Sequence, residues 1–165
     1  MATLALNLPQ SPRTAVFRAI DSILRHDPVL QRSIRPQSFR SWSGSTYDSV
    51  DFTLAMAPCI RLTPTHGAEV WKFPDAFVGP LFVKVEMLVA GYDVDDVMNL
   101  WWAIEKALYP SDFTAKSANI SALQAAGAYT GLAEFTQPAF DDSPSDKFFA
   151  AYGQIKIDVL LQLAP

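Results

Sequence analysis

Few side chains in this sequence have the type and spacing that catalysis or metal binding requires. The two histidines, His26 and His66, have no metal-ligand partner at a useful spacing, so we expect no metal site. Cys59 is the only cysteine; it lies within a strand-like pattern, and the nearest basic residue in sequence is Arg61. A nucleophilic cysteine needs an electropositive setting that lowers its pKa. We therefore expect Cys59 to be a thiol of the core.

Two acidic clusters are the other candidates for chemistry. Asp93, Asp95 and Asp96 precede a helical pattern, where capping and the helix dipole already account for acidic residues. They lack the glycine and the terminal glutamate of a calcium loop, and the seven glycines are scattered and form no phosphate-binding loop. The sequence therefore predicts a protein that is not an enzyme and that binds no cofactor or metal. The second acidic cluster is typical of a solvated turn and contains Asp141, Asp142 and Asp146.

The composition predicts one globular domain that spans residues 1–165. Half of the residues are hydrophobic and 18% are charged, which is too apolar for a disordered chain and too interrupted for a membrane protein. The N-terminus lacks the basic start and the continuous apolar run of a signal peptide. A single cysteine cannot form a disulfide within the chain. We therefore expect a soluble protein of the cytosol.

Charge is distributed unevenly along the chain. Residues 1–40 carry six arginines against two aspartates, a net charge of +4, and the other 125 residues carry −8. This asymmetry indicates either nucleic-acid contact or subunits that meet positive face to negative face, and a solvated helix face is the third explanation. We do not expect sequence-specific DNA recognition, because the acidic body repels phosphates and no recognition-helix or zinc-finger pattern is present.

Two segments have the periodicity of an amphipathic helix. The first covers residues 12–24, with Ser11 as the expected cap and proline in the first helical position. Pro28 either ends this helix or starts a short second one. The other stripe covers residues 94–108 and includes Val94, Val97, Met98, Trp101, Ile104 and Leu108. We expect Asp93 to cap this second helix.

Several segments alternate with a period of two, as half-buried strands do. In residues 81–89 the apolar side chains take one face and Lys84 and Glu86 take the other, and residues 152–163 repeat this pattern. We expect Gly79-Pro80 to separate the first of these strands from the one before it. Shorter strands are expected at 50–54, 59–64, 68–73, 118–123 and 132–140.

These elements predict a single α+β domain. Its mainly antiparallel sheet packs against two helices, the N-terminal helix and the helix at 94–108. Projecting loops or hairpins are expected at about 35–48, 64–80 and 110–130.

Aromatic and arginine side chains outside the apolar stripes are the candidate binding residues. Trp101 and Trp102 are adjacent on a helix, so their side chains diverge by roughly 100° and only Trp101 can face the core. Trp71 and Phe73 lie two apart in an extended segment, so they point to the same side, toward either a partner or the body beside the first helix. Aromatic residues are enriched at protein contacts. The candidate interface residues are Trp42, Trp71, Phe73, Trp102, Arg18 and Arg25.

Four sequence phrases follow one another in a recognisable order. They are a helix ending near HDPVL, a strand pair containing APCIRLTP, a strand entering GYDVDDVMNLWWAIEKAL and a last strand AYGQIKIDVLLQL. This order resembles that of the small α+β tail terminator, or tail completion, proteins of tailed bacteriophages. The chain departs from it in a long aromatic insertion at 35–48 and a long middle segment at 111–129.

The resemblance implies a structural protein of the virion neck, assembled in the host cytoplasm, without an active site. Such a protein forms a ring, usually of six subunits, that caps the tail tube, stops its polymerisation and joins it to the head connector proteins. DNA passes through the lumen without specific binding, and no membrane is involved. A closed ring needs two different patches on each subunit, which the +4 and −8 regions supply. The alternatives are a head completion or stopper protein of the neck and a ferredoxin-like enzyme or small-molecule-binding domain.

Overall fold

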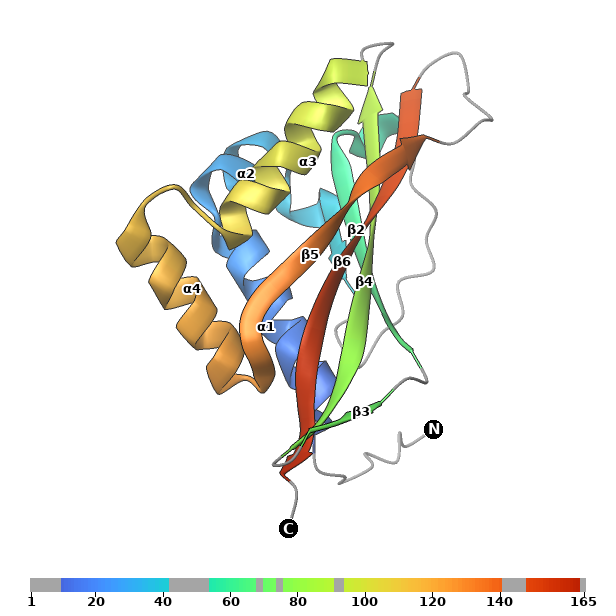
Figure 1. Cartoon of the computed structure of the whole chain (residues 1–165). Helices are drawn as coiled ribbons and strands as arrows, with labels where there is room; N and C mark the ends of the chain where they lie inside the picture. The colour runs from blue at the N-terminus through green and yellow to red at the C-terminus, as the bar shows by residue number, and fades with distance from the viewer. Residues whose placement is uncertain are drawn as a thin grey trace, which may run out of the picture.

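A mixed sheet with helices packed on one face forms the framework of the molecule (Figure 1). The computed structural model describes residues 10–41, 54–67, 70–73, 76–90, 94–140 and 148–163. Within these ranges the helices are α1 (Pro12–His26), α2 (Pro28–Ser33), α3 (Val94–Leu108) and α4 (Phe113–Ala125), with two short 3-10 turns, η1 (Pro36–Ser38) and η2 (Leu54–Met56). The strands are β1 (Phe39–Ser41), β2 (Cys59–His66), β3 (Trp71–Lys72), β4 (Ala76–Ala90), β5 (Ala128–Phe140) and β6 (Phe148–Leu163).

The strands are ordered β1-β2-β4-β6-β5, and β3 pairs with the beginning of β4. β1 runs parallel to β2, and the other pairs are antiparallel. The two long strands β4 and β6 form the centre of the sheet, and their apolar residues meet the helices. The α+β fold class with a mainly antiparallel sheet is therefore confirmed.

The alternation predicted for the long strands is confirmed. Along β4, Leu81, Val83, Val85 and Met87 are buried against the helices, and along β6 the same holds for Ile155, Ile157 and Val159. Lys84 and Glu86 lie on the open face of the sheet, where Arg61 Nε donates to Glu86 Oε2 at 2.6 Å. Burial would raise the pKa of Glu86, but the hydrogen bonds and charges of Arg61 and Lys84 outweigh burial and lower it.

The N-terminal helix forms as its periodicity predicts, and a short helix follows it. Ser11 occupies the N-cap position of α1, although its side chain makes no capping bond and its carbonyl accepts from Ala15 N at 3.0 Å. Asp27 ends α1 and caps α2, because its carboxylate accepts from the backbone N–H groups of Val29 and Leu30. Pro28 therefore starts a second helix. The buried side of α1 consists of Val16, Phe17, Ile20 and Leu24.

The prediction of a strand at 118–123 is wrong, because this segment lies within α4. Asp112 caps the helix through a 2.7 Å bond from Ala115 N to its carboxylate. Leu123 is the one buried residue of this fully described helix, so α4 has no apolar stripe to reveal it in sequence. Asn119 fastens α4 to the end of α3 by donating to the carbonyl oxygens of Ala107 and Leu108, both at 2.9 Å. The sheet therefore has more helical cover than the two helices predicted, and the segment at 110–130 is mostly helix.

Two further predictions about strands are corrected. Leu54 belongs to the 3-10 turn η2 and not to a strand, and residues 50–53 lie outside the described residues. Gly79-Pro80 does not interrupt the sheet, because β4 continues through both residues. In the described registers β2 pairs with β4 from Leu81 onward and β3 pairs with Phe77 and Val78. A proline is tolerated between these partners, since β4 is paired there on one side only.

Candidate interaction surfaces

Of the side chains first considered for chemistry, Cys59 and His26 are held in structural roles. Cys59 is fully buried, and burial raises the pKa of its thiol to about 12 although Arg61 partly opposes the shift. His26 Nδ1 lies 2.7 Å from the carbonyl oxygen of Ser22, so this nitrogen donates within its own helix. His66 ends β2, and Asp93 and the acidic cluster at 141–146 lie outside the described residues. Across the part of the chain that is described, no group of three or more metal-ligating side chains converges.

An exposed aromatic cluster lies where β3 meets the beginning of β5. Trp71, Phe73 and Tyr129 are 37%, 38% and 42% exposed, and we call these three residues the aromatic corner. The rings of Phe73 and Tyr129 stack at 5.4 Å between centroids with 20° between their planes. Lys156 Nζ lies 5.8 Å from the Trp71 ring centroid and 3.2 Å from Glu134 Oε2. The corner is thus ordered by its own contacts and keeps more than a third of each aromatic side chain accessible.

The structure describes residues 64–67, 70–73 and 76–80 of the hairpin predicted at 64–80. Within it, β3 contains two residues and pairs antiparallel with the beginning of β4. Phe73 reaches Tyr129 of β5, which sequence analysis did not single out. Tyr129 is distant from Phe73 in sequence and follows a helix without an apolar stripe, so no local pattern indicates that the two rings meet.

The arginines of the N-terminal region divide into bonded and accessible groups. Arg25 is held within the chain: Nε donates to both carboxylate oxygens of Asp21, Nη1 to the Phe39 carbonyl and Nη2 to Ser41 Oγ. Its guanidinium also lies 4.5 Å from the centroid of the Phe39 ring. Arg18 is exposed on α1, and further exposed arginines lie at the end of α2 and before η1. We call these three exposed arginines of the N-terminal region, Arg18, Arg32 and Arg35, the arginine end.

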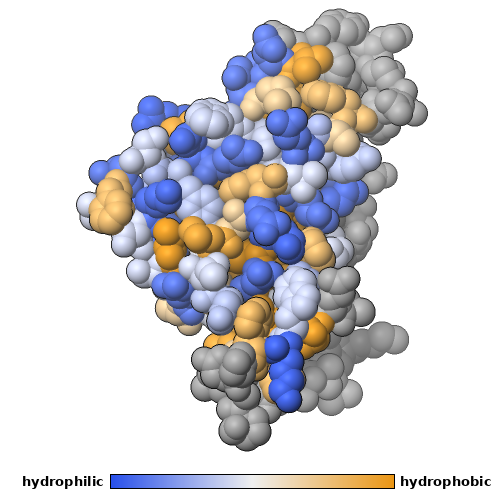
Figure 2. All heavy atoms as spheres, in the orientation of Figure 1, coloured by the Kyte–Doolittle hydropathy of each residue, from blue (hydrophilic) through white to orange (hydrophobic). Residues whose placement is uncertain are grey.

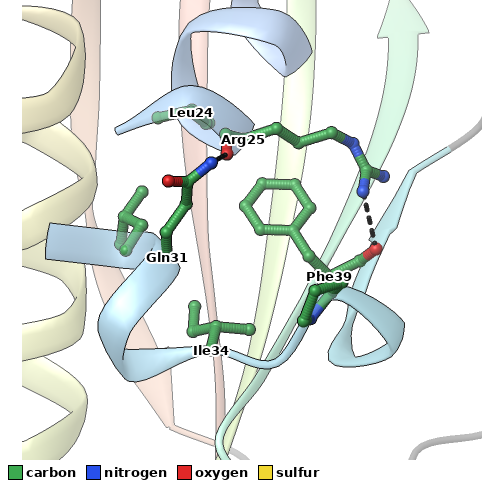
Figure 3. A pocket seen from close by; sticks show the side chains of 7 residues that line it. Leu24, Arg25, Gln31, Ile34 and Phe39 are labelled. Carbon is green, nitrogen blue, oxygen red and sulfur yellow. Dashed lines mark hydrogen bonds between the residues drawn. The ribbon is translucent and has the colours of Figure 1, made fainter. Parts of the chain in front are cut away.

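A pocket of about 270 Å³ lies between the end of α1, α2 and η1. Figure 3 shows Arg25 and Gln31 on opposite sides of it, with Gln31 Nε2 donating to the Arg25 carbonyl at 2.9 Å. The floor is apolar, and the one guanidinium that lines the pocket is already bonded to Asp21, Phe39 and Ser41. Its volume lies just below the roughly 300–1,000 Å³ of typical small-molecule sites. The residues that form its floor are Leu24, Leu30, Ile34 and Phe39.

The outer side of α3 carries a second exposed apolar surface. Val94, Met98 and Trp102 are 42%, 39% and 58% exposed, and Lys106 Nζ lies 4.5 Å from the Trp102 ring centroid. We call Val94, Met98, Trp102 and Lys106 the α3 ridge. Figure 2 shows apolar surface at the upper end of the molecule, where α3 begins in Figure 1. The prediction that Trp102 leaves the core while Trp101 enters it is confirmed.

The assignment of Val94 and Met98 to the buried stripe is wrong. At about 100° per residue, the side chains of Val94, Met98 and Trp102 project roughly 80°, 120° and 160° away from the centre of the buried face. These three residues therefore lie outside the buried face of α3, and Trp102 lies almost opposite to it. The buried residues of α3 are Val97, Leu100, Trp101, Ile104, Ala107 and Leu108.

The candidate interface residues therefore occupy separate places. Trp71 and Phe73 belong to the aromatic corner, Trp102 to the α3 ridge and Arg18 to the arginine end, while Arg25 is engaged within the chain. Trp42 lies outside the described residues. Figure 1 places β3 and α2 toward opposite ends of the molecule. The aromatic corner is therefore separated from Arg32 in α2 and from Arg35 just after it.

Comparisons with known proteins leave the family open. No protein-family model matches the chain, and no curated protein matches it either. Among the described helices, none combines the length and the apolar character needed to cross a membrane.

Proposed function

We propose that this chain is a structural protein of the neck of a tailed phage, whose copies form a ring that caps the tail tube and joins it to the head connector. The observation that carries the proposal is the aromatic corner. Three aromatic side chains from two separate segments gather there, and each is more than a third exposed. Exposed aromatic clusters are the surfaces most enriched at the energetic centres of protein contacts.

A ring requires two different patches that fit each other, and the arginine end supplies the second. Guanidinium groups stack on aromatic faces and remain charged at every working pH. The arginine end bears Arg18, Arg32 and Arg35, all exposed, and residues 10–41 contain six arginines against two aspartates. Contact between the arginine end of one copy and the aromatic corner of the next is head to tail. Repetition of such a contact closes a ring when the rotation between copies permits it.

A head completion or stopper protein of the same neck would use the same type of ring and differ in its partner.

The observation that favours another class, a small-molecule-binding domain, is the pocket beside Arg25. That function predicts a monomer with a bound metabolite. A ring with no bound metabolite supports the neck protein.

The proposal is tested with the full chain and a double variant, Trp71→Ser with Phe73→Ser. We expect electron microscopy of the wild type to show rings and the double variant to remain folded by circular dichroism without forming rings. Tyr152→Ser is the matched control, because Tyr152 is an exposed aromatic residue on the open sheet face. Rings that persist in the double variant would overturn the proposed contact. Loss of folding would show that the two rings belong to the core instead.

A further inference from the structure

We propose that the α3 ridge is a second contact surface, and that its partner is the α3 ridge of another copy packed antiparallel to it. This inference goes beyond the ring, because a contact between identical surfaces pairs copies about a two-fold axis and cannot itself build a head-to-tail ring. It would join two rings, or two free subunits where no ring forms.

The spacing of the ridge makes it suitable for helix packing. Its four residues follow one another at intervals of four, the row that interdigitates in the commonest class of helix contact. From Val94 to Lys106 the row spans roughly 18 Å at 1.5 Å per residue. The side chain of Trp102 is more than half exposed, although the opposite side of the same helix is buried in the core. An exposed apolar row on a rigidly anchored helix offers a partner a surface that needs no rearrangement.

The charges of α3 select the antiparallel direction. Asp95 and Asp96 lie in the first turn and Lys106 in the last. When two copies pack antiparallel about a point between Met98 and Trp102, the Lys106 of each faces the acidic first turn of the other. The helix dipoles then also run in opposite directions, which is favourable. Parallel packing would instead bring like charges together. Glu105 is half-buried and projects on the flank of the ridge opposite to Asp95 and Lys106, so in the antiparallel pair it does not lie directly against the acidic first turn of the partner.

The centre of the contact is an aromatic and sulfur pair. In the antiparallel register Met98 of one copy lies against Trp102 of the other, twice across the two-fold axis. Thioether sulfur packs favourably against aromatic rings. Three apolar residues per copy cover less than the roughly 800 Å² per partner of a standard interface, so the pair forms weakly unless several contacts act together. Two rings of six subunits that face each other would form six such contacts at once, which strengthens the whole assembly.

The first test measures the mass of the assembly in Trp102→Ser over a dilution series. The wild type is expected to reach twice the mass of the variant, whatever the size of the underlying ring. The control is Tyr152→Ser, which removes a comparably exposed ring from the open sheet face and should leave the mass unchanged. An unchanged mass in folded Trp102→Ser would overturn the proposal. Ring formation by the same variant would leave the neck function intact, so the two proposals fail separately.

The second test fixes the direction of packing by cross-linking. Met98→Cys and Trp102→Cys are prepared separately, and the native Cys59 is buried and does not interfere. Under oxidation, a 1:1 mixture of the two variants should give a covalent dimer that contains one chain of each kind. Each variant alone should give little, because identical positions are offset along the antiparallel helices. Dimers formed equally well by either variant alone, or no dimer in the mixture, would overturn the antiparallel register.

Discussion

Trp101 and Trp102 are neighbours in sequence, yet their indole rings lie in different surroundings. Trp101 faces the sheet, where it meets Phe135 edge to face at 6.1 Å and lies directly over Gly153. Trp102 faces outward, with Lys106 above its ring. The two sides of α3 therefore lie in different environments. Its inner side packs into the core, and its outer side carries the exposed side chains of Val94, Met98 and Trp102.

The largest expected effect is on the inner side. Trp101→Ala removes a buried indole and should destabilise the protein by about 3–5 kcal/mol. Urea unfolding measures this change, and Trp102→Ala is the matched control. Equal losses from the two substitutions would break the distinction between the inner and outer sides.

The next effect comes from the strand beneath Trp101. A Cβ at Gly153 would lie 2.5 Å from two atoms of the Trp101 ring, closer than packed carbon atoms allow. Gly153→Ala should therefore cost about 1–3 kcal/mol through overpacking. Combining it with Trp101→Leu should relieve the clash. The double variant should therefore lose less stability than the sum of the losses in the two single variants. If the two losses of stability are strictly additive, the contact with the Trp101 ring is not what makes Gly153→Ala destabilising.

Tyr109, just after α3, provides a pH-dependent test of the inner side. Its hydroxyl accepts from Ala133 N at 2.6 Å and donates to the Gly131 carbonyl at 3.0 Å, where β5 departs from regular pairing with β6. Tyr109→Phe leaves the Ala133 N–H without this acceptor and should cost about 1–3 kcal/mol.

The same residue predicts an alkaline loss of stability. Burial raises the pKa of Tyr109 from 10.0 to about 12, although the bond from Ala133 partly opposes the shift. The neutral phenol therefore stabilises the fold fully below pH 10, and this contribution is lost as the pH rises toward 12. Between pH 10 and pH 12, the midpoint temperature of thermal unfolding should fall more steeply in the wild type than in Tyr109→Phe. Parallel curves would contradict the assignment.

The smallest effect on stability is expected on the outer side. Trp102→Ser removes a ring that is more than half exposed, so the free energy of unfolding should change by less than about 0.5 kcal/mol. Chemical unfolding at low protein concentration measures this without a contribution from assembly. A loss of several kcal/mol would show that Trp102 supports the fold and would remove the basis for treating the ridge as a contact surface.

The sequence predicted those parts of the fold that have strong periodicity. α1, the inner face of β4 and the closing strand β6 follow patterns of buried residues that are visible in the chain. The helix α4 could not be predicted from the sequence, because it buries Leu123 alone and is fixed by Asp112 and Asn119, whose hydrogen bonds leave no hydrophobic period.

The surfaces were predictable only in part. The divergence of Trp101 and Trp102 follows from helix geometry, so the outward position of Trp102 was accessible from sequence. The exposure of Val94 and Met98 could not be predicted from the sequence. An apolar row spaced by four resembles a core stripe, and only the structure shows that the other side of the helix is the buried one. The stacking of Phe73 on Tyr129 depends on how β3 and β5 are brought together, which no local pattern encodes.

The most direct test of the proposed function is the mass of the purified full chain in solution, measured by sedimentation velocity with the Trp71→Ser, Phe73→Ser double variant alongside. The neck protein predicts a wild-type assembly of at least six chains, with the folded double variant reduced to one or two. A wild type that remains at one or two chains at every concentration, or a double variant with the wild-type mass, would contradict the account.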